Sequence, residues 1–148
     1  MARFNYKMQN ILNIKLKLEE QEKMNFAMAQ ARVDEEQMKL QQLMIRRASY
    51  EKQLKELAQG EIKIKEIHIC KNAIESMKVA IRAQMIELSK AQKALEIARK
   101  RLNEVMMERK MHEKLKEKAF EQFKADINYE EGKIIDELVS STFKSDED

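Results

Sequence analysis

Residues 67–119 read IHICKNAIESMKVAIRAQMIELSKAQKALEIARKRLNEVMMERKMHEKLKEKA, and large aliphatic side chains recur in them every seven residues. One series consists of Ile67, Ile74, Ile81, Leu88, Leu95 and Leu102. A second lies three residues later: Cys70, Met77, Gln84, Ala91, Ala98, Val105, His112 and Ala119. Two such series form the a/d pattern of a coiled coil, and about seven heptads exceed the three or four needed to identify one. The stretch predicts one long helix that packs against another helix along this seam.

The composition agrees with an all-α fold. Of 148 residues, 43% are hydrophobic and 37% charged, and the chain has two glycines and no proline. A compact domain of this length would need turns built from Gly, Pro, Asn or Asp. A disordered charged chain would have no reason to space its leucines regularly. We therefore expect a chain that buries a narrow seam rather than a globular core.

The partner helix is expected to come from the same chain. Residues before Gly60 carry their own two seam series: Phe26, Val33, Leu40 and Leu54, with Leu43, Tyr50 and Leu57. Gly60 suits the left-handed conformation that ends many helices. Facing positions of antiparallel helices have residue numbers with a constant sum, and the two sets interlock in this way, with Leu57 opposite Ile67, Leu54 opposite Cys70 and Leu43 opposite Ile81.

The predicted fold is a single two-helix antiparallel coiled-coil hairpin spanning residues 1–148, with an overhanging C-terminal helical segment. Helix 1 is expected at about 4–58, the tip at about 59–64, helix 2 at about 65–142 and a disordered tail at 143–148. In helix 1, Phe4, Ile11, Ile14 and Leu18 also have heptad spacing, with Phe4 opposite Phe120. Leu18 and Phe26 are not a multiple of seven apart, which predicts a phase shift between about Glu19 and Asn25.

Beyond about Phe123, helix 2 has no counterpart in helix 1. It nevertheless keeps an apolar stripe at helical spacing, formed by Leu115, Ala119, Phe123, Ile127, Ile134 and Leu138. An unpaired helix with an apolar stripe is a typical docking site for a partner.

No catalytic constellation is evident. His68 and His112 are far apart, Cys70 fits a seam position, and both glycines are isolated, so we expect no enzyme activity, metal or cofactor. The net charge of +3 is mixed in sign and predicts no nucleic-acid binding. A single cysteine fits a reducing cytoplasm, and no apolar run is long enough for membrane insertion.

Two patterns leave alternatives open. Lys110, Lys114, Lys116 and Lys118 are interleaved with Glu108, Glu113 and Glu117, which indicates either ion pairs on a solvated face or a docking surface for an acidic partner. The eleven methionines either fill gaps or form an adaptable apolar surface that accepts partner helices.

Four segments resemble the flagellar export protein FliJ family. The opening RFNYKMQNIL, Arg3–Leu12, resembles the start of these proteins, and the family's C-terminal signature is similar to residues 107–110, 113–123 and 135–138. The resemblance covers nearly the whole chain and extends to its length and its lack of catalytic residues. It implies a cytoplasmic component of the flagellar type III export apparatus, peripheral at the cytoplasmic face of the flagellar base.

The resemblance also implies partners. Family members resemble the stalk of rotary ATPases; they are expected to bind the ring of the flagellar export ATPase, the cytoplasmic part of the export gate, and escort chaperones of late substrates. The implied ATPase-binding residues are Phe4, Ile11, Leu115, Phe120, Phe123, Ile127 and Leu138. The implied gate-binding residues are Ala73, Met77, Ala80 and Gln84, where Ala73 replaces an aromatic residue and Gln84 a histidine. The alternatives are a structural coiled-coil subunit of another rotary or secretion ATPase and a homodimeric coiled-coil scaffold.

Overall fold

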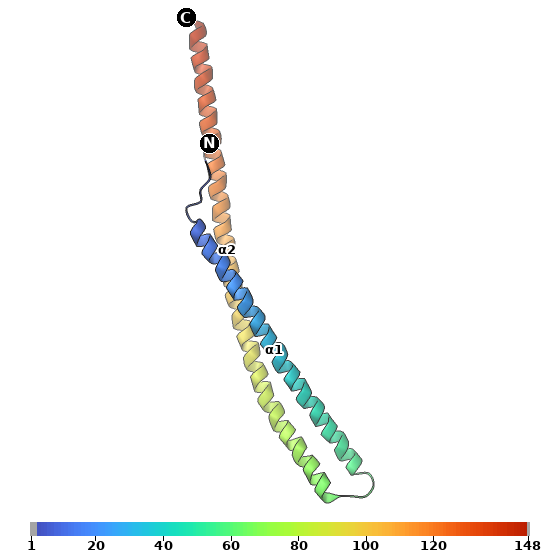
Figure 1. The fold of residues 1–148 in the computed structure, drawn as a ribbon. Coiled ribbons are helices and arrows are strands. Elements are labelled where there is room, and N and C mark those ends of the chain that lie inside the picture. Colours follow the sequence, from blue (N-terminus) through green and yellow to red (C-terminus); the bar gives the residue numbers. More distant parts are fainter. Residues whose placement is uncertain (1–2, 148) are drawn as a thin grey trace. The chain divides into compact units, whose positions relative to one another are not determined.

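The structure is a computed structural model that describes residues 3–147, with side-chain surroundings for residues 3–144. Its described residues form two α-helices and no strand: α1 spans Gln9–Leu57 and α2 spans Ile64–Glu147 (Figure 1). The chain divides into two compact units. Unit 1 combines the residues up to Glu20 with those from Glu104 onward, and unit 2 is Gln21–Asn103. Each unit contains a stretch of both helices.

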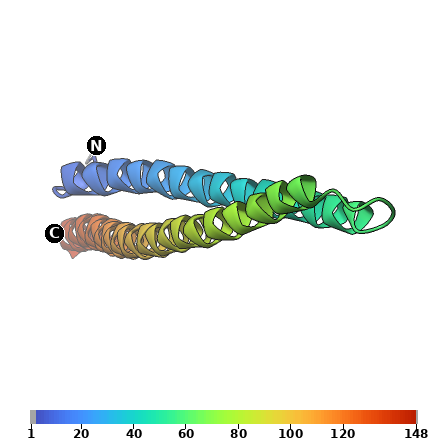
Figure 2. The same cartoon turned by 90° about the horizontal axis from the view of Figure 1, so that it is seen from below.

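Unit 2 is an antiparallel pair of helices joined by a short connection, which lies at one end of the pair in Figure 2. Its buried apolar side chains are Val33 from α1 and, from α2, Cys70, Ile74, Ile81, Ala91 and Ala98. All the a/d positions predicted on α2 between Ile67 and Ala119 are buried or half-buried. The predicted helical hairpin is confirmed, because the seven-residue spacing places one side chain per two turns against the facing helix.

The connection between the helices occupies residues 58–63. Ala58 N donates a hydrogen bond to Leu54 O at 3.1 Å, and Gln59 N donates to Glu56 O at 3.2 Å, so the last turn of α1 tightens before the chain leaves it. Gly60 follows with a φ of 102°, a backbone conformation that residues with a Cβ rarely adopt. The expected left-handed glycine is therefore present in the tip.

The start of α1 differs from the expectation of a helix from about residue 4. Residues 3–6 are not helical, residues 7–8 form a turn, and the helix begins at Gln9. Gln9 N donates to Tyr6 O and Leu12 N donates to Met8 O, both at 3.1 Å. Because residues 3–8 do not continue the helix, Phe4 can lie against aromatic side chains of α2.

The predicted phase shift in α1 is wrong. The more buried positions keep an unbroken spacing of seven along the helix: Leu12, Glu19, Phe26, Val33, Leu40, Arg47 and Leu54, with Lys15, Glu22, Ala29, Glu36, Leu43, Tyr50 and Leu57. Ile11 and Ile14, which suggested the other register, are exposed. The seam accepts Lys15 and Glu19 because each is paired with an opposite charge on α2.

The end of α2 also differs from the expected boundary at about residue 142. The helix continues to Glu147, and Asp148, the end of the expected tail, lies outside the described residues. Thr142 Oγ1 donates to Leu138 O at 2.9 Å within the helix. Neither of the two described helices contains a segment that could span a membrane.

Candidate functional site

An aromatic cluster joins the N-terminal segment to α2 in unit 1. The ring centroids of Phe4 and Phe120 are 5.1 Å apart at an interplanar angle of 66°, and those of Phe4 and Phe123 are 5.4 Å apart at 50°. Lys124 Nζ lies 4.7 Å from the Phe120 ring centroid. Tilted and edge-on ring pairs at these separations are favourable. The predicted pairing of Phe4 with Phe120 is therefore present.

A groove lies beside this cluster. Its volume is about 570 Å³. Its walls combine apolar and charged side chains from both helices: Phe4, Gln9, Leu12, Leu16, Glu113, Lys116, Glu117 and Phe120. Such a concave, mixed surface can receive a side chain of a partner, with the charged rim fixing its orientation.

A charged layer crosses the seam of unit 1. Arg109 binds Glu19 with two hydrogen bonds, from Nε to Oε2 at 2.6 Å and from Nη2 to Oε1 at 3.1 Å. Its Nη1 donates to Glu113 Oε2 at 2.9 Å. These carboxylates, first Glu19 and then Glu113, raise the pKa of Arg109. Glu19 is only 5% exposed, so the bidentate contact compensates a charge that is largely removed from water.

A second ion pair reinforces this layer. Lys15 Nζ donates to Glu108 Oε2 at 2.7 Å. The hydrogen bond from Lys15, followed by its charge, lowers the pKa of Glu108. Both pairs join α1 to α2 within unit 1, so they fix the alignment of the helices at a place where few apolar side chains meet. These two pairs are difficult to predict from the sequence, because charged side chains interrupt the hydrophobic pattern that identifies seam positions.

The last part of α2 has no other segment beside it in unit 1 (Figure 1). From Asn128 to Lys144 every side chain is exposed. Ile134 and Leu138 continue the line of the half-buried Ile127 at helical spacing, and Ile135 and Val139 widen it. The opposite side is polar, with Lys133, Asp136, Glu137, Ser140, Ser141 and Lys144. We call residues 128–144 the free end of α2; it is an amphipathic helix whose apolar side is uncovered.

The seven residues implied for ATPase binding all lie in unit 1. Phe4, Phe123 and Ile127 are half-buried, whereas Ile11, Leu115, Phe120 and Leu138 are exposed. Phe4, Phe120 and Phe123 are brought together in the aromatic cluster. Ile11 precedes the buried Leu12 and is exposed at the flank of the seam, and Leu115 lies on another side of α2 from Phe123 and Ile127. The structure therefore gathers part of the set and leaves these two outside it.

The four residues implied for gate binding lie in unit 2, and all are half-buried. Gln84 is engaged within the chain: its Nε2 donates to Glu36 O at 3.0 Å and also to the Glu36 carboxylate. The bond from Gln84 is the main cause that lowers the pKa of Glu36. A partner that used Gln84 would have to replace these bonds.

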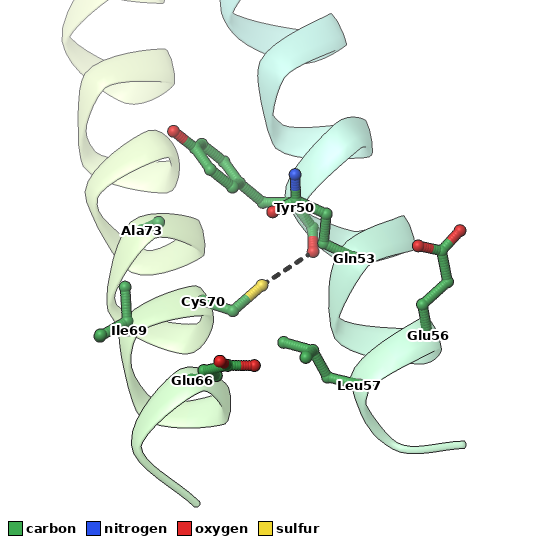
Figure 3. A pocket seen from close by; sticks show the side chains of 8 residues that line it. All are labelled: Tyr50, Gln53, Glu56, Leu57, Glu66, Ile69, Cys70 and Ala73. Carbon is green, nitrogen blue, oxygen red and sulfur yellow. Dashed lines mark hydrogen bonds between the residues drawn. The ribbon is translucent and has the colours of Figure 1, made fainter. Parts of the chain in front are cut away.

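Ala73 lines a groove near the tip with a volume of about 410 Å³ (Figure 3). Cys70 lies in the same groove and donates from Sγ to Tyr50 O at 3.1 Å, so the thiol is buried and hydrogen-bonded. Glu56 and Glu66 lie at the edge of the groove. Within the described residues, no group of three or more His, Cys, Asp or Glu side chains is arranged to hold a metal ion.

One protein family, described as flagellar FliJ protein, matches residues 4–147. No curated protein and no solved structure matches the chain significantly. The family match covers both helices, the aromatic cluster and the free end of α2. The chain belongs to the flagellar FliJ family and is thereby a component of flagellar protein export.

Proposed function

We propose that this chain is a non-enzymatic, stalk-like component that binds the flagellar export ATPase through unit 1. The observation that carries the proposal is the free end of α2, which remains helical and amphipathic without a partner helix. Exposed apolar side chains on such a helix gain free energy when another surface covers them. The adjoining groove beside Phe4 and Phe120 extends the available contact area.

The charged layer supports the proposal by fixing the base from which the free end projects. Glu19 and Arg109 hold α1 to α2 with paired hydrogen bonds, and Lys15 and Glu108 add another contact. A rod inserted in a ring changes the ring's activity only if it contacts the conformations of the subunits differently. Because the base is fixed, the free end can contact the different conformations of the ATPase subunits differently.

We further propose that unit 2 binds the cytoplasmic part of the export gate, with Ala73, Met77 and Ala80 as the contact residues. Ala73 and Ala80 lie beside the seam, and Met77 is a seam position that is only half-buried, so a partner can reach the exposed part of each side chain without separating the helices. Gln84 is the least suitable of the four because Glu36 accepts its hydrogen bonds. Binding of escort chaperones of late substrates, and a cytoplasmic location at the flagellar base, complete the proposal.

The ATPase proposal is tested with the purified export ATPase. Adding the full chain should increase the fraction of ATPase assembled into rings, measured by light scattering, and raise its turnover. Ile134→Ser/Leu138→Ser should abolish both effects because it removes the centre of the apolar stripe. Lys133→Ser/Glu137→Ser is the matched control, since it changes the polar side of the same turns and leaves the net charge unchanged.

If both double variants stimulate the ATPase equally, the free end is not part of the contact with the ATPase. If the unaltered chain changes neither ring assembly nor turnover, the proposed stalk function is wrong. A homodimeric scaffold remains the alternative function, and the seam within one chain argues against it. A solution mass of one chain, measured by sedimentation, is the expected result.

A further inference from the structure

The outer side of α2 in unit 1 carries an apolar stripe that the aromatic cluster and the free end do not use. Met107, Met111 and Leu115 follow one another at four-residue spacing and are 71%, 57% and 45% exposed. Residues of the seam in this part of α2, such as Val105, Arg109 and His112, are half-buried and lie on the other side of the helix. The stripe therefore faces away from α1.

Three lysines run beside this stripe with the same spacing. Lys110, Lys114 and Lys118 are exposed, and no ion pair reaches any of them among the described residues. Two of the three acidic residues interleaved with them in the sequence are used elsewhere: Glu108 binds Lys15, and Glu113 binds Arg109. The third, Glu117, is exposed and lies three residues after Lys114. Most of the negative charge that seems to balance the lysines in the sequence is therefore drawn away from them in the structure. We call Met107, Met111, Leu115, Lys110, Lys114 and Lys118 together the Met–Lys face.

A shallow groove marks the centre of this face. It has a volume of about 430 Å³ and is lined by Met107, Glu108, Lys110, Met111 and Lys114. Glu108 is the acidic residue of the lining, and its charge is compensated by Lys15 at 2.7 Å. The groove thus combines flexible thioether side chains, which adapt to different partner shapes, with uncompensated positive charge.

We propose that the Met–Lys face binds an acidic amphipathic helix of a partner protein. Leucine or phenylalanine side chains of that helix would enter the groove between the methionines, while aspartate or glutamate beside them would pair with Lys110, Lys114 and Lys118. Charge complementarity selects this occupant, because a basic helix would be repelled by the same lysines. An anionic membrane fits less well, since recognition of anionic lipids typically uses clusters of about four to eight Lys or Arg residues, whereas this short face has Lys110, Lys114 and Lys118 alone.

The inference does not rest on the proposed ATPase contact, which is assigned to the free end of α2; Leu115 is the one residue of the implied ATPase set that the Met–Lys face includes. It is tested with a designed helical peptide about five turns long. The peptide has leucine at every third or fourth position and glutamate on both sides of the leucines. Isothermal titration calorimetry with the full chain should detect one peptide per chain, with weaker affinity at high salt because the lysine contacts are screened.

Lys110→Glu/Lys114→Glu should weaken the affinity about ten-fold or more, since it converts two attractions into repulsions. The matched control is Lys71→Glu/Lys93→Glu, which makes the same charge change at exposed lysines of α2 in unit 2 and should bind as the unaltered chain does. Met107→Ser/Met111→Ser should also weaken binding, whereas a peptide with the same composition but scattered leucines should bind poorly. Circular dichroism verifies that each variant keeps its helix content.

The proposal is overturned if the peptide does not bind, or if the two lysine double variants weaken it equally. Equal binding of the scattered peptide would reduce the contact to charge alone and would also overturn it. Two further outcomes assign the face to a different occupant: binding to vesicles of phosphatidylglycerol and phosphatidylcholine that Lys110→Glu/Lys114→Glu abolishes, or self-association of the chain that this variant abolishes.

Discussion

The two units pack the same seven-residue repeat with different chemistry. In unit 2 the buried positions of α2 are small or aliphatic: Cys70, Ile74, Ile81, Ala91 and Ala98. In unit 1 the seam contains the buried Leu12, the pair Glu19–Arg109 and the cluster of Phe4, Phe120 and Phe123. Unit 2 is therefore stabilised mainly by removing apolar surface from water, whereas unit 1 relies on paired charges and aromatic contacts.

This difference shows how one unit can bury most of its apolar side chains between its helices, while the other keeps its helices aligned and leaves apolar side chains exposed to partners. An apolar layer packs against any facing apolar side chain of suitable size. A charged layer is stable only while both members are present, so it specifies one alignment. Unit 1, which contains the free end of α2, the open groove and the Met–Lys face, thereby keeps its helices aligned while leaving apolar side chains exposed.

The largest stability effect is expected in the apolar seam. Ile81→Ala should lower the free energy of unfolding by about 2–4 kcal/mol, because Ile81 is 5% exposed and its loss leaves a cavity between the helices. Urea unfolding followed by circular dichroism measures the change. Ile134→Ala in the free end is the matched control and should stay within about 0.5 kcal/mol of the unaltered chain. Equal losses would remove the distinction between the two regions.

The next effect is expected in the charged layer. Arg109→Met should lower the thermal unfolding midpoint because Glu19 is left as a nearly buried carboxylate without its bidentate partner. Glu19→Met/Arg109→Met should recover much of the loss, since it removes both charges and supplies apolar side chains of similar size. If the double variant is less stable than Arg109→Met alone, the two charges do not act as a pair.

A smaller effect is expected at the aromatic cluster. Phe4→Ala should cost about 1–2 kcal/mol, because it removes the ring contacts with Phe120 and Phe123. The same change should expose residues 3–8 to limited proteolysis while α2 stays protected. Phe143→Ala, on an exposed ring of the free end, is the control and should leave both measurements unchanged. Unaltered cleavage in Phe4→Ala would mean that the cluster does not hold the N-terminal segment.

The smallest effect is a pH dependence in unit 2. The hydrogen bond from Gln84 lowers the native pKa of Glu36 below 4.5, so the folded state favours the ionised form. The resulting stability is complete above about pH 4.5 and is lost as the pH falls through the lower native pKa. Unfolding midpoints measured from about pH 7 to about pH 3 should fall less steeply for Glu36→Gln than for the unaltered chain. An identical slope would mean that Glu36 does not contribute.

The sequence predicts the α2 seam well because its side chains are apolar and regularly spaced. Every predicted position from Ile67 to Ala119 is buried or half-buried, and Gly60 has the expected positive φ. The start of α1 is predicted less well. Ile11 and Ile14 suggested a seam register that the structure does not use, and Leu12, Lys15 and Glu19 take those positions instead. Hydrophobic spacing alone fails here because the seam positions are partly charged.

The candidate sites divide in the same way. The apolar stripe after Phe123 is visible in the sequence, and the structure leaves it uncovered. The Met–Lys face cannot be recognised from the sequence, because Glu108 and Glu113 lie among the lysines and look like their ion-pair partners. Only the pairing of these two glutamates with Lys15 and Arg109 shows that Glu117 is the one interleaved carboxylate left beside Lys110, Lys114 and Lys118.

The amino-acid sequence alone determined the all-α hairpin, because a seven-residue apolar period and a single glycine-containing break allow few other arrangements. The tertiary structure decided the register of α1 in unit 1, the early departure of the chain from the helix before Gln9, and the side of α2 on which positive charge accumulates. These features depend on which charges and rings meet across the two helices. Such meetings join residues about 90 positions apart, as Glu19 and Arg109 are, and no local pattern encodes them.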